Sequence, residues 1–402
     1  MRSKRVVAGA VGAAMIAAGA VVAMPAVPVG AVTVEVADEA GLRAALTGAS
    51  NSEPNVISLA ADITIAGATD PLYVSTQPLT VEGNGHTLDG AGNSRVLQIG
   101  GGSAADLTVR DLVARNGRAD DDDGGAIKVN GDLTIVDSAF FDSSSPDDGG
   151  AVHANGTLTI SGSTFSGNSA SSSGGAASSN AGMTITNSTV TGNATGIAGG
   201  AVFSRGEMRL TYVTVAGNAT EEDSANVRTF DDLVTVGSVI VDPQGGPSCQ
   251  VNGVVSSEGF NYADDTSCGL VAPTDTQDGA DPLLGALADN GGPTPTRLPA
   301  AGSPLVDAIP AGDCVPGVTT DQRGLSRPAD GDADGTPACD IGAVEVGGGT
   351  PATTTTTAPP PAGGPTTTST PTTAPAPGPA APATTAAATA ATAVVARATF
   401  TG

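Results

Sequence analysis

A fixed spacing of 25 residues separates four copies of a Gly-Gly-Ala triplet, and this repeat limits the possible folds more than any other feature of the chain. The triplets begin at Gly124, Gly149, Gly174 and Gly199. A period of about 20–50 residues is typical of solenoids, in which each repeat covers the hydrophobic face of its neighbour. We therefore expect a solenoid.

Two further apolar positions recur in register with the triplet. The first lies in segments that alternate apolar and polar residues, such as Leu133-Thr134-Ile135 and Leu158-Thr159-Ile160, and the second is occupied by Phe140, Phe165, Val190 and Val215. Alternation with a period of two indicates strands and not helices. Together with the triplet segment, each repeat contains three short strands separated by turns rich in Gly, Ser, Asn and Asp. Three strands and three turns close one coil of a parallel β-helix, so the expected fold class is all-β.

Asparagines also follow the repeat. Asn168, Asn193 and Asn218 are 25 residues apart, and in coils about 4.8 Å apart their amides can bond along the stack as an asparagine ladder. Residues 32–245 should form roughly eight coils, about 40 Å in length. Asp38 precedes a short helical pattern with Leu42 and Leu46 on one side, which predicts a helix that caps the N-terminal end of the stack.

The N-terminal segment, residues 1–31, has the pattern of a secretory signal peptide. Three basic residues precede an apolar run that continues to about Met24, and Val29-Gly30-Ala31 offers a cleavage site after Ala31. An uncleaved membrane anchor is the alternative, because the run is almost long enough to span a bilayer. The prolines and small residues that follow favour cleavage, which leaves no membrane span in the mature chain. We expect a secreted protein, extracellular or associated with a cell wall.

The repeat ends near residue 245, and residues 246–346 are expected to cap the other end of the stack. This segment holds all four cysteines, and disulfides are common in secreted chains. Three pairings are possible; we favour Cys249–Cys268 with Cys314–Cys339, because these bonds close short loops. Residues 347–402 are rich in Thr, Pro, Ala and Gly and predict an extended stalk without a core.

The chain is strongly acidic, with a net charge of −25 that becomes −28 when the three basic residues of the signal peptide are removed. Such a surface repels phosphate backbones, so nucleic acid is excluded as a partner. It favours solubility and cation binding. The oligomeric state does not follow from the sequence.

The triplets, with Phe165-Ser166-Gly167-Asn168 between two of them, resemble the GGAI and FxxN repeats of polymorphic outer membrane proteins. This resemblance implies a right-handed parallel β-helix of the pectin-lyase-like class. The segment after the repeats is similar to the choice-of-anchor Q domain family of bacterial surface proteins. The motifs that carry this second resemblance are Leu287–Thr296, Ser303–Asp307, Thr320–Gly324 and Cys339–Glu345. Together the two resemblances imply a surface location and no particular activity.

Two acidic clusters are candidate calcium sites. The repeat predicts that Asp122 stacks on Asp147 and that Asp123 stacks on Asp148, which would bring four carboxylates about 5 Å apart. The second cluster contains Asp330, Asp332 and Asp334 and matches the first half of a calcium-binding loop, although Ile341 replaces its final Glu. Calcium is therefore the candidate cofactor at both clusters. In each case a solvated acidic loop without an ion is the alternative.

An enzyme remains a second hypothesis, because many parallel β-helices cleave acidic polysaccharides. A lyase would need a base, for which Lys128, Arg110 and Arg115 are the candidates. However, the chain has no Trp, three Tyr and seven Phe, so few aromatic rings are available to stack on sugars. Neither His86 nor His153 has a nearby Ser or Cys nucleophile with a supporting acid in the sequence, and we expect no catalytic triad.

Rows of threonines, such as Thr164, Thr189 and Thr214, suggest a third and weaker hypothesis, which is ice or surface binding. The sequence favours a secreted or cell-surface β-helix with a structural or adhesive role, which presents a face to an extracellular polysaccharide or a cell-wall component. The alternative is a Ca²⁺-assisted polysaccharide lyase or glycoside hydrolase.

Overall fold

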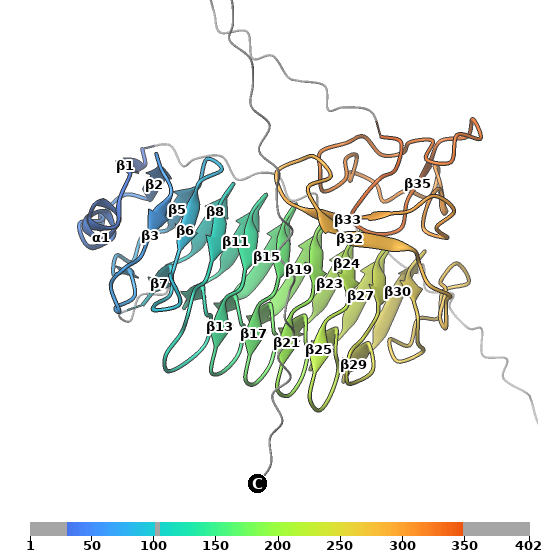
Figure 1. Cartoon of the computed structure of the whole chain (residues 1–402), viewed down its shortest axis with the longest axis horizontal. Helices are drawn as coiled ribbons and strands as arrows, with labels where there is room; N and C mark the ends of the chain where they lie inside the picture. Colours follow the sequence, from blue (N-terminus) through green and yellow to red (C-terminus); the bar gives the residue numbers. More distant parts are fainter. Residues whose placement is uncertain (1–29, 101–104, 349–402) are drawn as a thin grey trace, which may run out of the picture. The chain divides into compact units, whose positions relative to one another are not determined.

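The computed structural model describes residues 30–100 and 105–348, which form a parallel β-solenoid (Figure 1). The predicted signal peptide and stalk lie almost wholly outside these residues. Ten strands stack in the longest sheet and define about nine turns of the solenoid. The all-β fold predicted from the 25-residue repeat is confirmed.

Each complete turn contributes one strand to each of three sheets, which we call sheets A, B and C. Sheet A contains β1 (Val32–Val36), β2 (Asn55–Leu59), β5 (Leu79–Glu82), β8 (Leu107–Arg110), β11 (Leu133–Val136), β15 (Thr157–Ser161), β19 (Gly182–Thr186), β23 (Met208–Thr211), β27 (Leu233–Val236) and β30 (Val255–Gly259). Sheet B contains β3 (Ile63–Thr64), β6 (Thr87–Asp89), β9 (Val113–Arg115), β12 (Ala139–Phe141), β16 (Thr164–Ser166), β20 (Thr189–Thr191), β24 (Thr214–Ala216), β28 (Val239–Val241) and β31 (Tyr262–Ala263). Sheet C contains β4 (Leu72–Tyr73), β7 (Leu97–Ile99), β10 (Ile127–Val129), β14 (Val152–Ala154), β18 (Ala177–Ser179), β22 (Val202–Ser204), β26 (Val227–Thr229) and β29 (Cys249–Val251).

Four central turns also contribute a two-residue strand to a fourth sheet, sheet D, which the sequence did not predict. Its strands are β13 (Ser144–Ser145), β17 (Ser169–Ala170), β21 (Ala194–Thr195) and β25 (Ala219–Thr220). They lie between sheets B and C in the chain. These pairs of small residues have no apolar alternation, which explains why they were missed.

The Gly-Gly-Ala triplets form the turn that enters sheet C. The first glycine of each triplet has a positive φ, between 65° and 70°, which strains other residues. The second glycine allows close contact between coils: a Cβ added at Gly125, Gly150 or Gly175 would lie 2.1–2.2 Å from the carbonyl oxygen of the equivalent glycine in the next coil. Both positions therefore require glycine, for different reasons.

Apolar side chains fill the interior of the solenoid, and the predicted asparagine ladder lies beside them. Phe140 and Phe165 stack with their ring centroids 4.8 Å apart. The Asn168 amide donates to Asn193 Oδ1 (2.9 Å), and the Asn193 amide donates to Asn218 Oδ1 (3.0 Å). All three asparagines are at most 1% exposed. The ladder satisfies buried polar groups that would otherwise lack partners.

The N-terminal end is capped by α1 (Glu39–Thr47), as predicted. The Asp38 carboxylate caps this helix by accepting from the Gly41 N–H at 2.7 Å. Leu42 and Leu46 are buried and belong to the solenoid core. Of the helices in the described residues, none combines the length and apolarity needed to cross a bilayer.

The C-terminal end differs from the expected arrangement. The parallel sheets continue beyond residue 245 to β30 and β31, and residues 264–281 then cover the end of the stack, with Leu270 buried in the solenoid core. Residues 282–348, which we call the lateral segment, lie along sheet B and not over the end (Figure 1). The segment contains two antiparallel strand pairs, β32 (Leu284–Ala288) with β33 (Thr296–Pro299), and β34 (Ile309–Pro310) with β35 (Ala338–Cys339).

Hydrogen bonds fix the lateral segment to the outer face of sheet B. Gln322 donates to Thr164 Oγ1 (2.8 Å) and accepts from Thr189 (2.6 Å), while the Ala343 N–H donates to Thr214 Oγ1 (3.0 Å). These threonines are at most 2% exposed. The lateral segment therefore covers this threonine row, and the hypothesis that the row forms an ice-binding surface is wrong.

Cys339–Glu345, one of the motifs that resemble the choice-of-anchor Q domain, is buried throughout its length in the lateral segment. Arg327 and Glu345 make an ion pair at 2.7 Å, with both side chains fully buried, and Arg327 also lies 4.1 Å from the ring centroid of Tyr212 in the solenoid. The disulfides are Cys249–Cys268 and Cys314–Cys339, with Cα–Cα distances of 4.7 and 5.9 Å. This is the sequence-local pairing. Cys249–Cys268 joins β29 to the loop that covers the end of the stack.

Candidate functional site

The three candidate bases do not converge on one site. Arg110 is on sheet A and pairs with Glu82 at 2.8 Å, whereas Arg115 is on sheet B and pairs with Asp89 at 2.9 Å. Lys128 is on sheet C. Three outward-facing residues on three different sheets cannot act on the same bond.

Lys128 instead belongs to a charged network on the outer face of sheet C. Its ammonium contacts Asp122 and lies 3.2 Å from Asp123. Arg95, which is 2% exposed, contacts Asp122 and Asp70 and donates to the Asp123 carbonyl at 2.9 Å. The sequence interpretation missed Arg95, which precedes the first triplet.

Asp123 and Asp148 of this network stack as the 25-residue repeat predicts. Asp123 Oδ1 accepts from the Asp148 N–H at 3.2 Å, and Asp148 Oδ1 accepts from the Ser173 N–H at 3.0 Å. Carboxylate oxygens of Asp123, Asp147 and Asp148 lie within 4.8 Å of one another, which is a geometry that a cation could bridge. Asp122 is not part of this group, since Lys128 and Arg95 contact its carboxylate.

The electrostatic balance differs between the stacked carboxyls. Burial would raise the pKa of Asp123, but the neighbouring His153 and Lys128 outweigh it and hold this pKa below its usual value. Burial raises the pKa of Asp147, and the adjacent Asp148 and Asp123 add to the increase. Negative charge is therefore less compensated at Asp147 than at Asp123.

A Ser-His-Asp arrangement occurs on the same face, contrary to the sequence expectation. His153 Nδ1 lies 2.7 Å from Ser178 Oγ, and His153 Nε2 lies 3.7 Å from Asp123 Oδ2. Ser178 lies one 25-residue step after His153 and could have been found from the repeat, whereas Asp123 lies 30 residues before His153. However, Ser178 is fully buried, and a Cβ on Gly149 would lie 2.6 Å from its hydroxyl oxygen. A substrate carbonyl cannot reach this serine, so the arrangement is not a nucleophilic site.

A second group of carboxylates is found in the lateral segment. Carboxylate oxygens of Asp307, Asp330 and Asp332 lie within 4.8 Å of one another. Asp334 is outside the group and accepts from the Thr336 N–H. The sequence predicted Asp334 as the third acidic residue of this group, but Asp307 is the third residue in the structure. The Gly331 and Asp332 N–H groups donate to the Asp307 carboxylate and hold it beside Asp330 and Asp332.

A row of four polar side chains and one aromatic ring borders sheet C where the chain turns toward sheet A, and all but Asn130 are exposed. We call it the turn row, and its members are Asn130, Asn155, Asn180, Arg205 and Phe230. The Asn155 amide donates to Asn130 at 3.0 Å, the Asn180 amide donates to Asn155 at 2.8 Å, and Arg205 Nε donates to Asn180 at 2.8 Å. The sequence interpretation missed this row, although its members are 25 residues apart.

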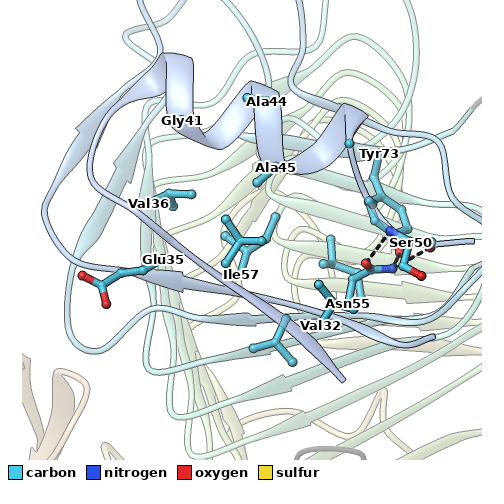
Figure 2. Close-up of a pocket in the computed structure, with 15 residues that line it drawn as sticks. Val32, Glu35, Val36, Gly41, Ala44, Ala45, Ser50, Asn55, Ile57 and Tyr73 are labelled. Atoms are coloured by element: carbon cyan, nitrogen blue, oxygen red, sulfur yellow. Dashed lines mark hydrogen bonds between the residues drawn. The ribbon is translucent and has the colours of Figure 1, made fainter. Parts of the chain in front are cut away.

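A cavity of about 390 Å³ lies between α1 and the first strands of sheet A (Figure 2). Apolar residues such as Val36 and Ile57 line it, together with the small residues Ala44 and Ala45 of the helix. Its buried polar group, Asn55, bonds to the Tyr73 hydroxyl at 2.7 Å. The cavity is a mostly apolar gap beneath the capping helix.

The fold and the dispersed charged residues define a parallel β-solenoid whose outer faces are its prominent feature. One protein family matches part of this solenoid. Residues 33–231 match the family model described as "putative pectate lyase-like adhesive domain". Over this range the chain is similar to pectate lyase-like adhesive domains. No curated protein and no solved structure matches the chain.

Proposed function

We propose that the chain is a secreted or cell-surface adhesive protein whose β-solenoid presents a glycan- or surface-binding face. The match of residues 33–231 to a pectate lyase-like adhesive domain carries this proposal, because it includes most of β1, the next seven strands of sheet A and their turns. The two disulfides are consistent with an extracellular location. In this proposal residues 1–31 direct secretion and residues 347–402 form a stalk.

Catalysis is the competing proposal. A polysaccharide lyase needs a base close to the bond that it cleaves, and the ion pairs of Arg110 and Arg115 lie on different sheets from Lys128. Lys128 is itself held between two aspartates. This arrangement supports an adhesive over an enzymatic role.

Calcium is proposed at two places. The group Asp123, Asp147 and Asp148 would take a cation on the face of sheet C, and the raised pKa of Asp147, caused by burial and then by Asp148 and Asp123, indicates that positive charge would stabilise it. In the lateral segment, Asp307, Asp330 and Asp332 would hold a second ion. Asp330 Oδ1 is buried there without a hydrogen-bond partner.

The test compares retention with cleavage. The full secreted chain is incubated with cell-wall fragments and with neutral and acidic polysaccharides, with and without Ca²⁺, and both bound protein and newly formed chain ends are measured. We expect retention on at least one surface and no new chain ends. New ends that require Ca²⁺ would establish the lyase instead, and the absence of retention on every surface would refute the adhesive role.

A further inference from the structure

The turn row ends at an exposed aromatic ring. Phe230 is 44% exposed and is the only exposed aromatic residue in the described part of the chain. It packs edge-to-face on the buried Phe203, with centroids 5.3 Å apart, and the Arg228 guanidinium lies 4.4 Å from its centroid. An aromatic ring held in place but accessible to solvent is a platform on which the apolar face of a sugar can stack.

The rest of the row offers hydrogen-bonding groups at the equivalent position of each successive coil. An asparagine amide provides both donors and an acceptor, and an arginine provides several donors. Asn155, Asn180 and Arg205 are all exposed. Their mutual hydrogen bonds fix the side-chain planes in advance, so a ligand that binds them loses little additional side-chain entropy.

The spacing of the row suits one kind of polymer. Successive coils are about 4.8 Å apart, so the five residues extend about 19 Å parallel to the solenoid axis. Linear chains of β-1,4-linked pyranose rings repeat at a similar distance and carry hydroxyl or acetamido groups along both edges. In a glycan bound along the row, each sugar would therefore contact one coil.

The charges near the row argue against an acidic glycan. Arg205 lies 3.4 Å from Asp148, and Arg228 lies 3.5 Å from Asp223, so the carboxylates already compensate both cations. Asp147 and Asp148 border the same sheet, and the chain carries a net charge of −25. A polyuronate would be repelled from this surface, whereas a neutral glycan would not.

We propose that the turn row binds a neutral β-1,4-linked glycan parallel to the solenoid axis, with Phe230 stacked on one sugar ring and Asn155 and Asn180 hydrogen-bonded to others. This inference rests on the proposed adhesive function and assigns it a surface and a ligand class. The surface lies on the turn between sheets C and A, away from the outer face of sheet B that the lateral segment covers.

The experiment measures the binding of the full secreted chain to three soluble probes by calorimetry: cellohexaose, the hexamer of N-acetylglucosamine and hexagalacturonate. We expect binding to one of the two neutral probes and none to hexagalacturonate, and the two neutral arms distinguish a hexose chain from an N-acetylhexosamine chain. Phe230→Ala should weaken binding about three- to tenfold. Phe230→Tyr, which keeps the ring, should not weaken it.

A double variant, Asn155→Ala with Asn180→Ala, should weaken binding about tenfold, since two hydrogen-bonding groups are lost. Val271→Ala is the control, because Val271 is 80% exposed and belongs to the segment that covers the end of the stack and not to the turn row. Thermal unfolding confirms that each variant is folded. The inference is overturned if no neutral probe binds, if hexagalacturonate binds more tightly, or if Phe230→Ala binds as the wild type does. Retention on cell walls in the same preparations decides the adhesive proposal separately.

Discussion

The asparagine ladder supplies the most direct test of what holds the solenoid together. Replacement of Asn193 by alanine removes the acceptor of the Asn168 N–H (3.0 Å) and of the Asn168 amide (2.9 Å). It also removes the amide that donates to the Phe165 carbonyl at 3.1 Å. Both orphaned donors are buried, since Asn168 is 1% exposed. A buried donor without a partner costs about 1–3 kcal/mol, so two donors should lower the free energy of unfolding by about 2–6 kcal/mol.

Equilibrium urea unfolding followed by far-ultraviolet circular dichroism measures this loss. Asn180→Ala is the matched control, because Asn180 is also an asparagine in a stacked row but is exposed to water. It should lose no more than about 0.5 kcal/mol. Equal urea dependence of the free energy in all three proteins is required for the comparison. If the free energy of unfolding of Asn193→Ala were less than about 1 kcal/mol below that of the wild type, the cost assigned to the two unpaired donors would be refuted.

Three other predictions follow from the charged groups and the lateral segment. Burial and then Asp111 raise the pKa of Asp137 to about 6. The folded state therefore holds the Asp137 proton more tightly than the unfolded chain does. The stabilisation that this proton gives is complete below the unfolded pKa of about 4 and is lost as the pH rises through about 6. In urea unfolding at pH 7.5, the free energy of unfolding of Asp137→Asn should therefore be higher than that of the wild type by about 1–2 kcal/mol, after allowance for solvent screening. Below pH 4 the two free energies should be equal. Calorimetry with Ca²⁺ should give two binding events, one abolished by Asp148→Asn and the other by Asp332→Asn, and no heat at millimolar Ca²⁺ would end the proposal. Gln322→Ala should increase proteolysis of the lateral segment while the solenoid stays intact, and unchanged digestion would contradict the role of its hydrogen bonds to sheet B.

The sequence predicted the solenoid well because its contacts are repeated at a constant distance along the chain. The central coils pair with residues 25 positions away, as Leu133 does with Leu158, so one spacing determines the register there. The lateral segment could not be placed in this way. Gln322 bonds to Thr164, which is 158 residues earlier, and no repeat connects the two.

The candidate site was predicted only where its residues follow the repeat or lie close in sequence. The stacking of Asp123 on Asp148 follows from the period and is present in the structure. Asp307 joins Asp330 because the antiparallel pairing of β34 with β35 brings their loops together. Ser178 is not close to His153 along the chain, because the two residues meet only across adjacent coils.

The position of the lateral segment determines how the molecule would respond to a mechanical load. Its hydrogen bonds reach four successive coils, through Gly162, Thr189, Thr214 and Gly237. In a solenoid without such a segment each coil contacts only its neighbours, and a pull on the last coil would detach the coils one after another. A pull applied at Gly348 would instead load these hydrogen bonds in parallel across the side of the stack. These four coils would then stay folded until all of the bonds had broken together.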